Sequence, residues 1–298
     1  MRYKFAEIFE QIAKKDKKTV FMTGDLGFHA FERLRDKLGE RFINAGVAEH
    51  NMVTAAAGMA YAGLKPWIYS IAPFVTIKVL EEIRNDICLP NYNVKIIGLG
   101  GGYDYGIAGP THHAINDVGI MMTLPNMRIY TPGFAEHIAP IITKLNKESG
   151  PTYLRLTKAE PLNIKIPQYT SLQRIIRGDK VVVVVLGSII NKVLPAIQGL
   201  SRKNSVDLWL VSELPFNLTK ELKTSLQKTS NIVVVEEHVK TGGLGDYFQH
   251  LLVESKIYPK KYRHLHSRGY ISHRYGSRDF YLKENKLDRE SLKKELST

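Results

Sequence analysis

Apolar side chains recur at two different spacings along the first half of the chain. Residues 4–15 carry them at helical spacing, whereas residues 19–22 form a short apolar run of the kind found in buried strands. The alternation continues and predicts strands at 42–43, 66–69, 94–99, 127–130 and 153–156, with helices at 51–62, 75–88, 114–123 and 134–147. Strands that alternate with helices in this way predict a mostly parallel sheet covered on both faces.

A second alternating series begins at residues 181–186, five valines and a leucine, a run typical of a strand buried on both faces. Further strands are predicted at 206–211 and 232–235, and a charged helix near 288–296. Residues 161–178 are rich in proline and polar residues and lack clear periodicity, so we interpret them as a linker. The predicted fold class is therefore α/β, with two parallel-sheet αβα domains at residues 1–160 and 179–298.

Composition places the chain among ordinary globular proteins, with 44% hydrophobic and 24% charged residues in a length of 298. No apolar run reaches the roughly 18–20 residues that span a bilayer, and the first residues lack the apolar core of a signal peptide. Cys88 is the single cysteine, which excludes an intrachain disulfide and a zinc site built from several cysteines. These features predict a cytoplasmic protein with no membrane partner.

The formal net charge of +13 raises the question of nucleic-acid binding. The basic residues are spread along the chain, and we find no zinc-finger or RNA-recognition signature. A general positive field also attracts phosphorylated metabolites or an acidic partner subunit. The sequence therefore does not predict a nucleic-acid partner.

The segment RFINAGVAEHNMVTAAAGMAYAG at residues 41–63 is the strongest candidate for chemistry. A short strand is predicted to stop before Gly46, and Glu49 then begins a helix of small residues that lets another backbone or a flat ligand approach closely. Glu49 therefore lies at the carboxyl edge of a strand, where open α/β sheets place their ligands. Taken alone, Glu49 reads as a first-turn acid favoured by the helix dipole.

Five motifs in a fixed order change that interpretation, because together they resemble the transketolases. They are GDLG at 24–27, RFINAGVAEHNM at 41–52, GPTHH at 109–113, LPNMRIYTP at 124–132, and EEH followed by GGLG at 236–245. The resemblance covers only the C-terminal half of the polypeptide found in that family, namely the pyrimidine-binding and C-terminal domains. The GDG…N motif that holds the diphosphate and its metal in the family is absent.

This pattern implies the second subunit of a split transketolase. The N-terminal partner subunit would hold Mg²⁺ and the diphosphate of thiamine diphosphate, and this chain itself would hold no metal. An α2β2 heterotetramer in which this chain dimerises is the expected assembly.

The resemblance also assigns cofactor-binding residues. Glu49 matches the glutamate that hydrogen-bonds the thiamine pyrimidine and activates the cofactor, which implies a dry site that raises its pKa. Phe74, with Ile71 beside it, matches the region that supplies an aromatic face for the pyrimidine, although a plain core role for Phe74 is equally open. Asp25 matches an acid near the cofactor and the subunit interface, and is otherwise a turn residue.

A further set of residues is implied to contact substrate. His112 matches the histidine that faces the substrate oxygen next to the thiazolium, a role suited to proton transfer near neutral pH. His113 replaces a common glutamine and could contact substrate or the partner chain. Arg155 and Lys158 end a predicted strand where the family keeps a cation for a substrate phosphate, and a solvated strand end is the alternative.

The loop GLGGGYDYGIAG at residues 98–109 departs from the pattern THDSIGLGEDG of sugar-phosphate transketolases. Gly100 stands at the position of the phosphate-binding histidine, and Ala108 at that of the aspartate that reads a donor hydroxyl. Either Asp104 or Tyr103 compensates, or the substrate is not a usual pentose or hexose phosphate. In the second case Tyr103 and Tyr105 offer stacking faces to a modified or nucleotide-linked sugar.

The resulting hypothesis is a subunit of a thiamine-diphosphate-dependent transketolase that transfers a two-carbon ketol unit from a ketose donor to an aldose acceptor. The alternatives are the β subunit of a 2-oxoacid dehydrogenase, a condensing enzyme similar to deoxyxylulose-phosphate synthase, an inactive scaffold subunit, and a basic binding module. The motifs PTHH and PNMRIYTP disfavour the dehydrogenase, and the presence of Glu49 disfavours the scaffold.

Overall fold

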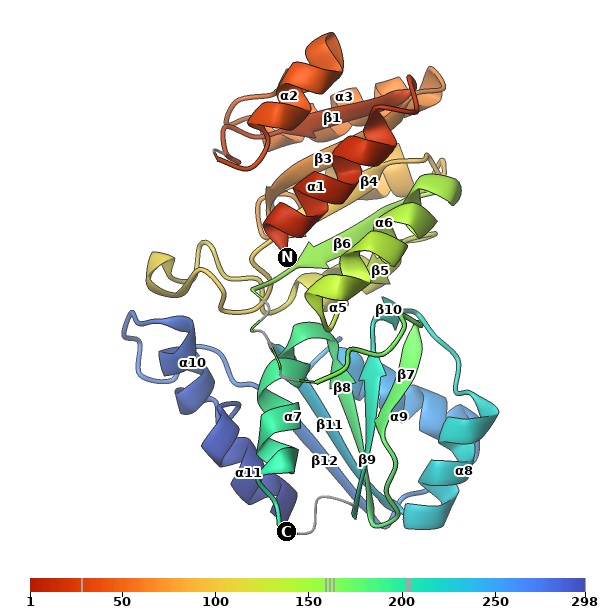
Figure 1. The fold of residues 1–298 in the computed structure, drawn as a ribbon, viewed down its shortest axis with the longest axis vertical. Coiled ribbons are helices and arrows are strands. Elements are labelled where there is room, and N and C mark those ends of the chain that lie inside the picture. The colour runs from red at the N-terminus through yellow and green to blue at the C-terminus, as the bar shows by residue number, and fades with distance from the viewer. Residues whose placement is uncertain (28, 159, 161, 163, 202–204, 298) are drawn as a thin grey trace.

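Two sheets lie one above the other along the long axis of the molecule in the computed structural model, each with helices on both faces (Figure 1). The structure describes residues 1–27, 29–158, 160, 162, 164–201 and 205–297. This arrangement confirms the predicted α/β class and its two mostly parallel sheets.

The first sheet has the strand order β10-β5-β6-β4-β3-β1-β2. All its neighbouring strands run parallel except β10, which pairs antiparallel with β5. The strands from the first half of the chain are β1 (Thr19–Thr23), β2 (Phe42–Asn44), β3 (Lys65–Ile71), β4 (Lys95–Leu99), β5 (Arg128–Tyr130) and β6 (Thr152–Leu156). The seventh strand, β10 (Glu213–Leu214), comes from the second half of the chain and ties the two sheets together.

Helices cover the first sheet because its strands alternate apolar side chains between two faces. One face packs against α1 (Arg2–Ala13), α2 (Glu32–Leu38) and α6 (Ile138–Lys147), and the other against α3 (Glu49–Tyr61), the helical segment 77–88 and α5 (Asp117–Met122). Segment 77–88 is not the single α-helix that we predicted: it consists of a 3₁₀ turn (Ile77–Val79), α4 (Leu80–Glu82) and a π-helix (Ile83–Cys88). Such π segments often occur at functional sites.

The second sheet has the order β12-β11-β8-β9-β7. Its strands are β7 (Leu172–Ile176), β8 (Val181–Leu186), β9 (Val206–Val211), β11 (Asn231–Val239) and β12 (Lys261–Ser267), and β7 alone among them runs antiparallel to its neighbour. Helices α7 (Ile190–Gln198) and α11 (Arg289–Ser297) cover one face, α8 (Lys220–Thr229) and α9 (Leu244–Glu254) the other, and α10 (Arg278–Glu284) precedes α11. Successive valines of β8 alternate between two core clusters, as expected of a strand buried on both faces.

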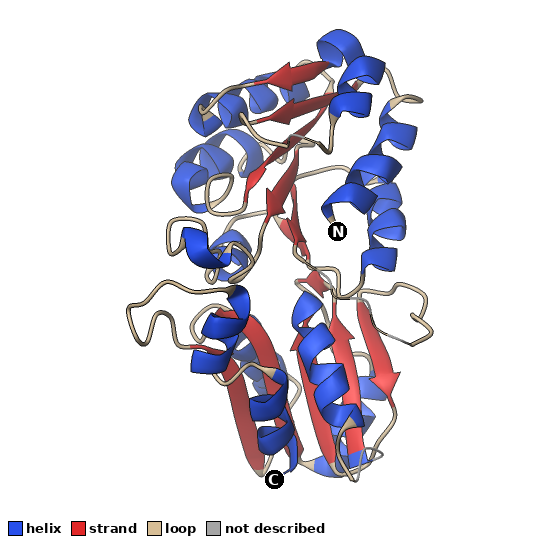
Figure 2. Ribbon diagram, turned by 60° about the vertical axis from the view of Figure 1, so that its left-hand side comes forward, coloured by secondary structure: helices blue, strands red, loops and turns tan. Residues whose placement is uncertain are grey.

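The predicted linker at 161–178 contains a strand that the sequence did not reveal. Residues 172–176 form β7 at the edge of the second sheet, while residues 161 and 163 lie outside the described part of the chain. An edge strand has one free side and needs no continuous apolar run, so its sequence resembles a loop. The two halves lie one above the other in Figure 2, and one core cluster contains residues of both.

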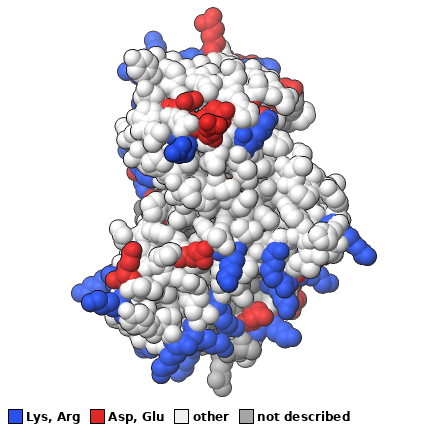
Figure 3. Space-filling view, turned by 180° about the vertical axis from the view of Figure 1, so that it is seen from behind, with Lys and Arg blue, Asp and Glu red and all other residues white. Residues whose placement is uncertain are grey.

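One face of the molecule shows how the charged side chains are distributed. On the face shown in Figure 3, Lys and Arg side chains are scattered over the C-terminal domain with Asp and Glu among them, and they form no continuous stripe. Within the described residues, no helix has both the length and the apolar character that crossing a membrane requires.

Lys95, at the start of β4, gives a prediction about stability. Its side chain is buried and Nζ donates to the carbonyl oxygens of Glu148 and Gly150 at 2.9 and 3.0 Å. Burial, helped by Arg128, lowers the pKa of Lys95 to about 7. Between pH 7 and 10 the unfolded chain therefore binds one more proton here, and stability should rise with pH by about 1.4 kcal/mol per unit. Urea unfolding across this range should show a slope in wild type that exceeds the slope in Lys95→Met by about this amount; equal slopes would contradict the assignment.

Candidate functional site

The candidate site lies at the carboxyl edge of the first sheet, where β2, β3 and β4 end. After β2 the backbone turns at Gly46, whose φ of 68° favours glycine, and α3 begins at Glu49. The amide of Asp25, in the loop after β1, donates to the carbonyl of Gly46. Two strand ends therefore fix the turn that presents Glu49.

Glu49 is a buried carboxylate with two side-chain partners. Its side chain is 3% exposed, Oε1 accepts a hydrogen bond from Ser70 Oγ at 3.2 Å, and Oε2 lies 2.8 Å from Lys78 Nζ. Burial by itself would raise the pKa of Glu49, but Lys78, the backbone and Ser70 together hold it below its usual value. The expected raised pKa is therefore wrong for this arrangement, because the sequence did not reveal the neighbouring ammonium.

Aromatic rings continue from Glu49 toward the loop after β4. Lys78 Nζ lies 5.9 Å from the centre of the Phe74 ring, and the Phe74 and His112 rings lie 5.2 Å apart, edge to face. His112 Nδ1 is 2.9 Å from Thr111 Oγ1, and the centres of the His112 and Tyr105 rings lie 5.7 Å apart. Successive contacts thus link Glu49 to Lys78, Lys78 to Phe74 and Phe74 to His112, and these four residues are here called the row.

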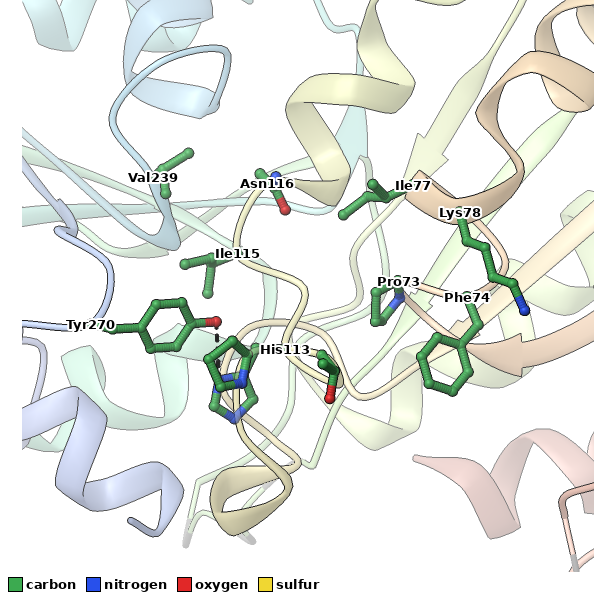
Figure 4. Close-up of a pocket in the computed structure, with 11 residues that line it drawn as sticks. Pro73, Phe74, Ile77, Lys78, His113, Ile115, Asn116, Val239 and Tyr270 are labelled. Atoms are coloured by element: carbon green, nitrogen blue, oxygen red, sulfur yellow. Dashed lines mark hydrogen bonds between the residues drawn. The ribbon is translucent and has the colours of Figure 1, made fainter. Parts of the chain in front are cut away.

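A cavity of about 530 Å³ opens beside this row, between the two domains (Figure 4). Phe74 and Lys78 lie on one side of it, and His113 and Tyr270 on the other, where Figure 4 shows their mutual hydrogen bond. Most of the lining is apolar, with a few polar groups, as is usual for ligand sites. The remaining lining residues are Pro73, Ile77, Pro110, Thr111, Ile115, Asn116 and Val239.

Tyr103 does not face open space, contrary to the stacking role we expected, and His113 reaches the cavity only at its edge. His113 is buried, with Nε2 2.9 Å from the carbonyl of Gly106 and Nδ1 3.2 Å from the Tyr270 hydroxyl, and burial lowers its pKa. Tyr103 is fully buried and stacks on Tyr281 of the second domain at 4.9 Å. Tyr103 therefore offers no stacking face to a substrate, and His113 contributes an edge of the cavity.

Arg155 is likewise not available as a phosphate-binding cation. It is 4% exposed, and its Nε lies 2.8 Å from Asp117 Oδ2. Its Nη2 donates to the carbonyls of Ala114 and Glu237. Asp117, with Glu237 more weakly, keeps the pKa of Arg155 raised although burial lowers it. The expected phosphate role is wrong here because the guanidinium is buried and its Nε and Nη2 already bind groups of both domains.

Lys158 differs from Arg155, because it is exposed and lines a second cavity of about 360 Å³. Tyr105 lines the same cavity, and a Cβ added to Gly100 would lie 2.1 Å from the Tyr105 ring. Tyr105 therefore occupies the space that a side chain at position 100 would need. The other lining residues are Met1, Arg2, Tyr3, Leu99, Asp104 and Thr157.

Asp25 and Ile71 lie at the margin of the site. Asp25 is exposed, and its Oδ1 accepts a hydrogen bond from Asn44 Nδ2 at 3.1 Å. Ile71 is half-buried at the end of β3, three residues before Phe74. Among the described residues, no group of three or more His, Cys, Asp or Glu side chains is placed to hold a metal ion.

Lys78, Ser70 and Tyr270 belong to the site but were not predicted. A signal for Lys78 was present, since it is the single cation in the apolar stretch 71–80 and lies four residues after Phe74. Ser70 lies in β3, and because that strand is buried, the sequence pattern does not show which face of the sheet Ser70 is on. No local signal marks Tyr270, because it reaches the cavity from the second domain.

Comparisons with known proteins agree with this architecture. The family model "Transketolase, pyrimidine binding domain" matches residues 1–161, and "Transketolase, C-terminal domain" matches residues 171–273. An apulose-4-phosphate transketolase subunit of Actinobacillus succinogenes is 30% identical over 220 residues, covering 72% of this chain and 71% of that protein. A 6-deoxy-6-sulfo-D-fructose transketolase subunit of Clostridium sp. strain MSTE9 is 27% identical over 254 residues, covering 82% and 78%.

A solved structure described as a split gene transketolase, inactive beta4 tetramer, superimposes with a TM-score of 0.81 at 26% identity, over 98% of this chain and 95% of that one. The chain spans about half, 48%, of 1-deoxy-D-xylulose-5-phosphate synthase from Clostridium perfringens, at 27% identity. The motif order, the two sheets and both domain matches lead to one conclusion: this chain belongs to the transketolase family, of which it comprises the pyrimidine-binding and C-terminal domains.

Proposed function

We propose that this chain is the pyrimidine-site subunit of a two-chain, thiamine-diphosphate-dependent transketolase that transfers a two-carbon ketol unit from a ketose donor to an aldose acceptor. The observation that carries this proposal is the buried carboxylate of Glu49 at the sheet edge, linked through Lys78 to Phe74 and His112. Relatives named as transketolase subunits support it.

The residues present fit the pyrimidine end of the cofactor. Glu49 supplies a buried carboxylate, and its partner Lys78 is 43% exposed, so the ammonium can swing toward solvent when the pyrimidine takes its place beside the carboxylate. Phe74 is half-buried beside it and offers a flat apolar face. Thiamine diphosphate, when bound, supplies the carbanion chemistry.

The protein's own groups then position and exchange protons. Glu49 holds a proton against the pyrimidine ring, and the buried setting keeps water from competing for that hydrogen bond. Displacement of Lys78 would remove the interaction that keeps the pKa of Glu49 low, so burial would then raise it. His112, half-buried with Nδ1 near Thr111 Oγ1, is the group in the row suited to proton transfer at a substrate oxygen.

The diphosphate and Mg²⁺ are assigned to an N-terminal partner chain. The described residues lack a metal-binding cluster and the sequence lacks GDG…N, which supports this assignment. Mg²⁺ characteristically bridges carboxylates and phosphates, and among the described residues no group of three or more His, Cys, Asp or Glu side chains is placed to hold it. Two copies of each chain in an α2β2 assembly, with this chain dimerising, complete the proposal.

The proposed substrate is a non-standard sugar whose far end is anionic. Lys158 lines the 360 Å³ cavity together with Tyr105, so a negative group bound there would meet the Lys158 ammonium. Gly100 and Ala108 replace side chains that bind ordinary sugar phosphates in similar enzymes. The named substrates of two relatives, apulose 4-phosphate and a sulfofructose, are in keeping with this class.

Lys158→Met should raise KM for an anionic substrate about 10- to 100-fold, the loss expected for one charge-assisted hydrogen bond, and leave neutral analogues unaffected. The measurement compares ketose–aldose pairs with the enzyme reconstituted from both chains. Xylulose 5-phosphate and ribose 5-phosphate should be poor substrates. If they react with kcat/KM of about 10⁴ M⁻¹s⁻¹ or more, the enzyme is an ordinary transketolase and the specificity proposal is wrong.

A condensing enzyme similar to deoxyxylulose-phosphate synthase is the second candidate, because one such synthase aligns with 98% of this chain. Incubation of the reconstituted enzyme with a 2-oxo acid and an aldehyde separates the two. Release of CO₂ would favour condensation, whereas ketol transfer without CO₂ favours the transketolase.

A further inference from the structure

The loop between β4 and α5 is held in place by the second domain. Residues 100–113, here called the substrate loop, carry Gly100, Tyr105 and His112, all of which the proposed function places at the substrate. Glu237, at the end of β11, is 3% exposed, and its Oε1 accepts the backbone N–H of Tyr103 at 2.8 Å. A Cβ at Gly102 would lie 2.4 Å from the Glu237 carboxyl carbon, so loop and carboxylate fit closely.

Arg278 joins this carboxylate to a second one on the loop. Its Nη2 lies 2.6 Å from Glu237 Oε2, and its Nε lies 3.2 Å from Asp104 Oδ1. Asp104 in turn accepts the backbone N–H of Lys158 through Oδ2 at 2.5 Å. Burial raises the pKa of Asp104, with Arg278 opposing it, while Arg278 keeps the pKa of Glu237 low against burial. One guanidinium from α10 therefore bridges the loop and the end of β11.

Aromatic packing extends the same contact. Tyr103 stacks on Tyr281 with an angle of 9° between the rings, and its hydroxyl donates to the carbonyl of Gly269 at 2.9 Å. Asn285 Nδ2 donates to the Tyr103 hydroxyl at 3.2 Å. Apart from the Lys158 amide, the groups described here that hold Tyr103 and Asp104 thus come from β11, from α10 and its end, and from the loop before α10.

We propose that Glu237 and Arg278 form a clamp by which the C-terminal domain positions the substrate loop. The pair touches neither Glu49 nor Phe74, so it acts on substrate binding through the loop and leaves the cofactor residues alone. A buried charge that loses its partner draws in water or moves, because it cannot remain unsolvated. Loosening the clamp therefore releases the loop and the side chains that it carries.

This inference rests on the proposed function for its kinetic part, so the test has a structural readout as well. Hydrogen exchange of the backbone amides in residues 100–113 is measured on the complex of this chain with its partner chain. Glu237→Gln should speed exchange there about tenfold or more, in the range of coupled buried pairs. The same variant should raise substrate KM about tenfold and leave cofactor affinity within about twofold.

Glu236→Gln is the matched control. Glu236 is the neighbouring buried carboxylate, but it accepts the N–H groups of Leu244 and Gly245 at the start of α9 and contacts His264 instead of the loop. This variant should leave exchange in residues 100–113 unchanged. If hydrogen exchange in residues 100–113 became equally faster in both variants, the effect would be a general destabilisation of the protein, and the proposed clamp would be wrong.

Arg278→Lys keeps the test decisive if Glu237→Gln does not fold. Lysine retains the charge but lacks the planar fork that reaches two carboxylates, so exchange and KM should rise less than in Glu237→Gln. The double variant should be no worse than the stronger single variant, since the two residues act as one unit. Unchanged exchange in Arg278→Lys and Glu237→Gln overturns the clamp, and faster exchange without a KM change overturns its role in positioning. A wild-type complex without ketol transfer contradicts only the proposed function.

Discussion

Glu49→Gln is expected to reduce turnover of the reconstituted enzyme by about 10²–10⁴-fold, the range for lost acid–base catalysis. Glutamine matches the shape of glutamate and can keep the hydrogen bond from Ser70, but it cannot carry the proton that the pyrimidine requires. Folding should be little affected, because the ion pair that is lost involves Lys78, whose side chain is 43% exposed. Initial rates and thermal unfolding of the complex measure the two effects.

Glu82→Gln is the control for this experiment. Glu82 lies on the helical segment next to the site, where its Oε1 is 2.5 Å from His50 Nδ1, whereas the side-chain partners of Glu49 found among the described residues are Ser70 and Lys78. Removing its charge should leave turnover within about twofold, as for most surface substitutions. Full activity of Glu49→Gln in the presence of the partner would remove Glu49 from the mechanism and with it the proposed function.

The isolated chain is expected to bind thiamine diphosphate at least about 100-fold more weakly than the complex does. This chain offers the pyrimidine a carboxylate and an aromatic face but offers the diphosphate no metal cluster among its described residues. Two lost charge-assisted hydrogen bonds, at about 1.5–3 kcal/mol each, already account for a factor of this size. Calorimetry with Mg²⁺, on the chain alone and on the complex, measures the difference.

Thiamine without its diphosphate separates the two ends of the cofactor in the same assay. Its affinity for the chain should not depend on Mg²⁺, because the pyrimidine contacts involve no metal. Tight, Mg²⁺-dependent binding of the diphosphate by the chain alone would contradict the division of the site between two polypeptides.

Much of the fold could be predicted because it depends on periodicity. The five valines of β8 indicate a strand buried on both faces, and its side chains do alternate between two cores. The short strands β7 and β10 were missed, because each lies at the edge of its sheet, has a partner on only one side and needs no apolar run. The continuous helix predicted at 75–88 was wrong in detail, since spacing alone does not separate α from π geometry.

The site was predicted unevenly for a related reason. Glu49, Phe74 and His112 follow strand ends of one parallel sheet, and such ends meet at a common edge whatever their separation in sequence. Tyr103 and Arg155 also follow or end strands of that edge, yet the structure buries them against Glu237, Tyr281 and the rest of the second domain.

By itself, the sequence determined which residues lie at the sheet edge, because strand order along the chain and hydrophobic period are local properties. Which of those residues face a cavity, and which are buried in contacts between the domains, depends on how the two domains pack in three dimensions. The same holds for the charge of Lys78. Its position is known from the sequence, but its ion pair with Glu49 forms only because two segments approach to 2.8 Å, and this pair lowers the pKa of Glu49. The electrostatic energy of an ion pair depends on the distance between the charges and on their burial, and neither quantity can be obtained from the order of residues in the chain.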